Sequence, residues 1–158
     1  MKTLMTAPLL LVLALALAVA TGAAAAPQAR VRDVVIHAGW TWGLGPSKTF
    51  TSTLTEEVNA GLEVCAAGQD LRLDLKIERL NIRQLGDIGL NRPNRLVAQV
   101  KVRQARDKAL IDLQRIDVTT PDEGLVAAVR DPEIILAEAT RDAICEAFFA
   151  KPATLAAP

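Results

Sequence analysis

The chain contains little of what enzymes commonly use for catalysis: a single histidine, His37, and only two cysteines. It has no tyrosine and few other aromatic residues, which argues weakly against a carbohydrate site built by stacking sugars on rings. The spacings H-E-x-x-H, G-x-S-x-G and S-x-x-K are all absent. One histidine alone supports neither a catalytic triad nor a zinc site. We therefore predict no catalytic residue, no metal and no cofactor.

The segment from Gly43 to Thr49 invites comparison with a phosphate-binding loop, because it lies between an expected strand and an expected helix. The motif requires glycine directly before its lysine, but Ser47 stands before Lys48 here. Trp42 occupies the position of the first glycine. The spacing therefore argues against nucleotide binding.

The first 26 residues have the composition of a secretory signal peptide. Lys2 is the only charge before Arg30, and the apolar run between them ends in small residues. Cleavage is expected at about residues 24–26. The alternative is an uncleaved membrane anchor, because about 20 uncharged residues can span a bilayer. The Ala, Leu and Arg bias of the chain favours a bacterial origin, so the protein is expected to be periplasmic or secreted.

Once this leader is removed, residues 27–151 have the length of one domain without an integral membrane segment, and residues 152–158 form a tail that we expect to be flexible. In an oxidising compartment Cys65 and Cys145 most simply form a disulfide. The alternative is a redox-active or metal-binding pair. The absence of a C-x-x-C spacing and of further ligands argues against that alternative.

Periodic apolar positions predict six elements in the order β-α-β-β-β-α. The expected ranges are a strand at 31–40, a helix at 48–66 with Ser47 as N-cap, strands at 71–82, 96–102 and 110–118, and a helix at 132–150. The apolar phase of the second strand shifts near Glu78 and Arg79, which predicts a β-bulge there. Residues 49–55 also alternate like a strand, but only a helix accounts for the whole apolar stripe from Phe50 to Cys65.

This order is typical of an α+β two-layer sandwich, with a mainly antiparallel four-stranded sheet and two helices on one of its faces. The disulfide would then join neighbouring helices. The layout resembles that of small bacterial envelope modules, including auxiliary components of envelope transport and outer-membrane assembly. No motif here is specific to one such family, so no functional residue is transferred from that resemblance.

Expected side-chain directions follow from the same patterns. In the first strand Val34, Ile36, Ala38 and Trp40 share the core side, while Val31, Asp33, Val35 and His37 face away. In the second helix the expected inner face carries Ile134, Ala137, Ile144 and Phe148, flanked by Ile135, Cys145 and Phe149.

Charge is uneven although the total is zero. Residues 71–115 carry eleven basic and five acidic side chains, whereas residues 117–146 carry two basic and eight acidic ones. We expect the outer sheet face to present Arg72, Lys76, Lys101 and Arg103, with His37 as a further candidate and with Asp74, Glu78 and Asp112 in the same rows. Such a face suits an anionic surface, although solvation and cross-strand pairing also explain it.

Trp40 and Trp42 flank one threonine in a glycine-rich loop. They either close one end of the core or form an exposed anchor for a partner. Together these features favour a non-enzymatic module that contacts an envelope protein or an anionic envelope polymer or lipid, and no nucleic acid. The alternatives are a carrier of a small apolar ligand and, less favoured, a hydrolase with an unrecognised site.

Overall fold

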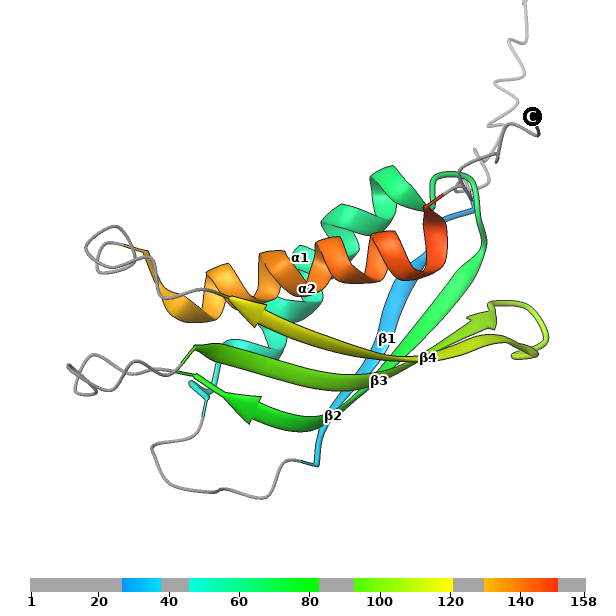
Figure 1. The fold of residues 1–158 in the computed structure, drawn as a ribbon. Helices are drawn as coiled ribbons and strands as arrows, with labels where there is room; N and C mark the ends of the chain where they lie inside the picture. Colours follow the sequence, from blue (N-terminus) through cyan, green and yellow to red (C-terminus); the bar gives the residue numbers. More distant parts are fainter. Residues whose placement is uncertain (1–26, 38–45, 83–92, 121–129, 151–158) are drawn as a thin grey trace, which may run out of the picture.

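The computed structural model describes residues 27–37, 46–82, 93–120 and 130–150. Its elements follow the predicted order: β1 (Arg30–Ile36), α1 (Phe50–Cys65), β2 (Leu71–Asn81), β3 (Asn94–Gln104), β4 (Leu110–Thr120) and α2 (Pro132–Phe149). The strands form one sheet in the order β1-β2-β3-β4, and Figure 1 shows both helices on the same face of it. The α+β two-layer prediction is therefore confirmed.

The sheet is mixed, because β1 runs parallel to β2 while β2, β3 and β4 are antiparallel. The register shifts where one strand has an extra residue, at Arg32 in β1, Glu78 in β2 and Ile111 in β4. Each shift is a β-bulge that changes which side chains face the helices. The bulge predicted near Glu78 is confirmed, and it returns Leu80 to the core side.

Two predicted side-chain directions are wrong, one of them because of a bulge. Val31 packs against the core instead of facing away, because the extra residue Arg32 restores the inward phase only at Val34. Asp112 pairs with the inward-facing Val102 and lies on the helix side of the sheet, so its prediction as an outer-face residue is wrong. Its carboxylate accepts from Gln114 Nε2 at 2.8 Å on that side.

The apolar stripe of α1 is buried as expected. Phe50, Leu54, Val58 and Leu62 are each at most 1% exposed and belong to the same core as the inward side chains of β2 and β3. The residue before α1 is Thr49, so the predicted N-cap Ser47 is wrong. Ser47 instead contacts the second helix. After α1 the backbone turns through Gly68 with a φ of +77°, a conformation that suits a residue without Cβ.

The start of α2 matches its sequence signal. Asp131 is the N-cap, its carboxylate accepts from Glu133 N at 2.9 Å, and proline occupies the first turn. The inner face differs from the prediction, because Leu136 and Thr140 are buried while Ile134 is 37% exposed. Thr140 satisfies its hydroxyl within the helix by donating to Leu136 O at 2.7 Å, which explains a threonine in the core.

Some predictions concern residues outside the described ranges. They are the signal peptide, the pair Trp40 and Trp42, most of the loop between β2 and β3, and the tail at 152–158. These stay predictions. Within the described part of the chain, no helix has the length and apolarity needed to cross a membrane.

Candidate functional site

The sheet face opposite the helices carries a row of three arginines from adjacent strands. Arg30 of β1 pairs in register with Arg72 of β2, and Arg72 pairs with Arg103 of β3. Cross-strand partners on one face lie about 5 Å apart at Cβ, and like charges placed directly opposite each other are destabilising. An anion bound over the row would remove that cost.

Two lysines extend this row toward the centre of the sheet. Lys101 of β3 stands opposite Asp74 in the strand register, and Lys76 is two residues further along β2. We use the name basic face for Arg30, Arg72, Lys76, Lys101 and Arg103. Its acidic neighbours are Asp33 and Asp74, which themselves pair in register, so the patch has five positive and two negative side chains and a net charge of +3.

The ion pairs of this patch are sparse. Arg103 Nε lies 3.3 Å from Asp74 Oδ2, and Arg103 Nη1 donates to Lys108 O at 3.0 Å. Arg72, Lys76 and Lys101 make no ion pair with any other residue in the described ranges. Three cations therefore remain available to a ligand from outside the chain.

The opposite half of the same face is arranged differently. Arg95 Nε donates to Asp117 Oδ1 at 2.8 Å, and Arg115 Nε lies 2.9 Å from Glu78 Oε2. Val97 pairs in register with Asp117, on the outer face, yet it is 0% exposed and stands outside the main core cluster. This half carries Arg95 and Arg115 in ion pairs around a buried valine, while Arg79, in register with that valine, makes no ion pair within the described ranges. One unpaired cation lies here, against three in the basic face.

The hydrogen bond from Arg95 lowers the pKa of Asp117 below its usual value of 3.8, with Arg115 and Arg79 adding attraction. A carboxyl group with a lowered pKa stabilises the fold at pH values above its unfolded pKa. That contribution is lost as pH falls through the folded value, below 3.8. Because the pair is exposed to solvent, the effect is expected to be small.

Four of the five residues of the basic face were predicted from the sequence, and the fold brings these four together on β2 and β3. Arg30 was not among them, because the first strand was predicted to begin one residue later. Plain alternation from Val34 would have placed Arg30 on the core side, and only the extra residue Arg32 turns it to the outer face. His37 directly follows β1, and its backbone N–H donates to Ile77 O at 2.8 Å.

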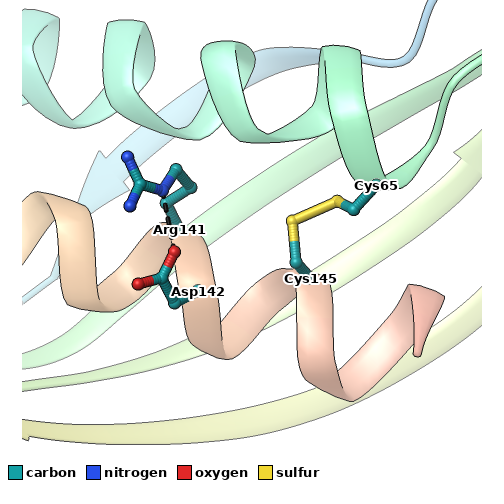
Figure 2. Close-up of a disulfide and its surroundings, with 4 residues drawn as sticks. All are labelled: Cys65, Arg141, Asp142 and Cys145. Carbon is teal, nitrogen blue, oxygen red and sulfur yellow. Dashed lines mark hydrogen bonds and ion pairs between the residues drawn. A yellow bond between two sulfur atoms is a disulfide. The ribbon is translucent and has the colours of Figure 1, made fainter.

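The helix layer is joined at three places along its length. Cys65 and Cys145 form a disulfide with their Cα atoms 5.8 Å apart, and Figure 2 shows it bridging α1 and α2. Arg141 of α2 reaches toward α1, where its Nη1 lies 3.3 Å from Glu57 Oε2. The third contact joins the starts of the two helices, whereas the disulfide joins them near their ends. The helices α1 and α2 therefore run in the same direction.

Glu133 makes that third contact. Its Oε1 accepts from Ser47 N at 2.6 Å, and its Oε2 accepts from the hydroxyl of the same serine. A carboxylate in the first turn of α2 thus accepts hydrogen bonds from the chain just before α1. Negative charge is favourable at both helix starts because of the helix dipole.

We expect Glu133→Ala to lower the free energy of unfolding by about 1–2 kcal/mol, because it leaves the Ser47 N–H without its acceptor. Urea denaturation measures the change. Glu146→Ala on the exposed side of the same helix is the matched control and is expected to change stability by less than about 0.5 kcal/mol. Equal losses in the two variants would contradict the assigned role.

Two hollows lie beside α1. One of about 290 Å³ is lined by Pro27, Gln28 and the end of the helix, and another of about 370 Å³ is lined by β1 and the first turns of α1. The second lies at the β1 edge of the sheet, between that strand and α1, whereas the side chains of β2 and β3 that face the helices are buried. Within the described ranges, no three histidine, cysteine or acidic residues gather as metal ligands.

No known protein-family profile matches the chain, and no curated protein is similar to it in sequence. Among solved structures, a candidate lipoprotein from Caulobacter crescentus is similar at 18% identity and a TM-score of 0.47, over 76% of this chain and 93% of that one. Protein XCC0632 from Xanthomonas campestris, of family DUF330, is similar at 16% identity and a TM-score of 0.43, over 78% and 82%. A minor lipoprotein from Acinetobacter baumannii is similar at 13% identity and a TM-score of 0.37, over 75% and 92%. At this level the likeness concerns the arrangement of elements and does not extend to function.

Proposed function

We propose that the protein is a non-enzymatic binding module of the bacterial cell envelope whose basic face binds an anionic envelope component. The observation that carries this proposal is the arginine row across β1, β2 and β3. Arg103 is bonded to Asp74 and Arg30 donates to Gln28 Oε1 at 3.0 Å, whereas Arg72 between them has no partner within the described ranges. The row is therefore a favourable site for an anion centred on Arg72. The signal peptide predicted from the sequence and the disulfide between Cys65 and Cys145 support an extracytoplasmic location.

The opposite half of the same face, in which Arg95 and Arg115 form ion pairs, provides a comparison that supports the proposal. If the outer face served only solubility, its charges could be paired throughout, as Arg95 and Arg115 are. Instead three unpaired cations, Arg72, Lys76 and Lys101, lie in one half of the outer face, against Arg79 alone in the other. Guanidinium groups bind phosphate and carboxylate through parallel hydrogen bonds, so several of them together favour a ligand with repeated negative charges.

The test is binding of dextran sulfate, a soluble polyanion, by the mature disulfide-bonded protein. We expect the double variant Arg72→Glu/Lys101→Glu to bind at least about tenfold more weakly, because each charge near a polyanion contributes about 1 kcal/mol. Affinity of the unaltered protein should also fall as salt rises from 0.05 to about 0.5 M, since the Debye length shortens.

The matched control reverses the same number of charges on the helix side. Lys48→Glu/Arg130→Glu changes two exposed cations that precede α1 and α2, so its net charge equals that of the first variant. We expect this control to retain most of the binding. Equal weakening in both variants would mean that only net charge matters, and the proposal would be rejected.

A further inference from the structure

A second feature adjoins the basic face at its β4 edge. Leu110, Ile111 and Leu113 are 52%, 53% and 44% exposed, three large apolar side chains within four consecutive residues. Single exposed apolar residues are ordinary on protein surfaces, but a cluster on one edge strand is not. The cluster therefore needs a physical explanation.

The register shows what surrounds the cluster. Leu110 pairs with Arg103, and Leu113 pairs with Lys101, so the two leucines continue the rows of the basic face. The intervening Ile111 is the bulged residue of β4. Apolar and cationic side chains thus share one continuous outer surface.

The turn between β3 and β4 adds further cations. Arg106 is 85% exposed at its side chain and lies 3.7 Å from Asp70, and Lys108 occupies the turn with a φ of 62°. Figure 1 shows the β3–β4 hairpin extending past the end of α2, so that neither helix covers its tip. The exposed leucines and the cations lie together on this projecting hairpin.

We infer that this hairpin docks on the surface of an anionic lipid bilayer; the inference rests on the proposed function and names its anionic component. Leu110, Ile111 and Leu113 enter the boundary between headgroups and acyl chains, while Lys101 and Arg103 contact lipid phosphates. Stable membrane association usually requires two signals, an apolar insertion and a basic patch, and both occur here side by side. A soluble polyanion would use the cations but would leave the apolar cluster in water.

Edge-to-edge pairing with a second copy is less favoured. A β-bulge at Ile111 interrupts the regular hydrogen-bonding ladder in the middle of the apolar cluster, and bulges are a known protection of edge strands. Cations beside the cluster would also face the same cations of the second copy. Self-association would instead appear as a dimer in light scattering.

The experiment measures co-sedimentation of the mature protein with vesicles of equal parts phosphatidylethanolamine and phosphatidylglycerol, and with vesicles of phosphatidylcholine alone. We expect binding only to the anionic vesicles. The triple variant Leu110→Thr/Ile111→Thr/Leu113→Thr, which keeps strand-forming residues, should bind these vesicles at least about tenfold more weakly. It should bind dextran sulfate as the unaltered protein does, and circular dichroism checks that it is folded.

The control Val64→Thr/Ile134→Thr removes exposed apolar side chains from the helix layer and should leave vesicle binding unchanged. Vesicle binding that persists in the triple variant, or is absent while dextran sulfate still binds through Arg72 and Lys101, would overturn the inference and leave the proposed function standing. If the unaltered protein bound neither vesicles nor dextran sulfate, the inference and the proposed function would both be rejected. A dimer in light scattering that the triple variant converts to monomer would assign the cluster to self-association and would also overturn the inference.

Discussion

Replacement of both Cys65 and Cys145 by serine is expected to lower the free energy of unfolding by about 4 kcal/mol. The bond closes a loop with a sequence separation of 80, and loop closure of that length removes much conformational entropy from the unfolded chain. For a domain of this size the loss corresponds to a fall in Tm of about 15 °C. Calorimetry of the variant and of the unaltered protein measures it.

Reduction provides an independent check of the same prediction. Dithiothreitol should lower the Tm of the unaltered protein by nearly the same amount and should not affect the double serine variant. Val64→Ser, close to Cys65 but 81% exposed, controls for the effect of a new hydroxyl at the end of α1. If reduction lowered the free energy of unfolding by less than about 1 kcal/mol, the unfolded chain would gain little conformational freedom when the disulfide is broken, contrary to the entropy argument.

The sequence was sufficient for the order and type of the elements because their periodicities are strong. Leu71 to Ile77 alternates without interruption, and the apolar stripe of α1 recurs at helical spacing. The bulge at Glu78 was also predictable, since the apolar phase changes visibly there. The start of α2 was encoded locally in Asp131 and Pro132.

Two of the failures have a common physical origin in tertiary contacts. The bulge at Arg32 lies among residues whose alternation does not change phase clearly, so the direction of Val31 could not be read from the pattern. Asp112 lies in phase with the buried Ile116 and Val118, so its direction was available from the alternation of β4 and was misassigned. Ser47 had the chemistry of an N-cap, but it hydrogen bonds to Glu133, 86 positions later in the chain. No local signal reports such a partner.

The candidate site was predictable in composition but not in arrangement. Alternation along β2 and β3 placed four cations on the outer face, whereas the row that Arg30 completes depends on the parallel register between β1 and β2. The apolar hairpin was hidden for the same reason, because only the shift at Ile111 directs Leu110 outward beside Arg103, in line with Leu113 beside Lys101. Register between strands is a tertiary property, set by the packed core.

Gly61 in α1 is expected to be the most sensitive glycine in the described chain, because the stem of Arg141 crosses it. A Cβ added at this position would lie 2.2 Å from Arg141 Cγ and 2.7 Å from Cδ, far inside van der Waals contact. We expect Gly61→Val to lower the free energy of unfolding by about 3 kcal/mol through overpacking between the helices. Gly61→Ala should cost less, since alanine also favours the helix by about 1 kcal/mol relative to glycine.

A double-mutant cycle identifies Arg141 as the cause. In an Arg141→Ala background the stem is absent, so Gly61→Val should cost less than about half as much, a coupling of at least about 1.5 kcal/mol. Arg141→Ala alone removes the partly exposed ion pair with Glu57 and should cost about 1 kcal/mol or less. Ala60→Val, on the exposed side of the same helix, measures the valine propensity alone. A Cβ at Gly61 would also lie 3.5 Å from the sulfur of Cys145. If Gly61→Val were equally destabilising with and without Arg141, the clash would have to be attributed to that sulfur or to the backbone of α2.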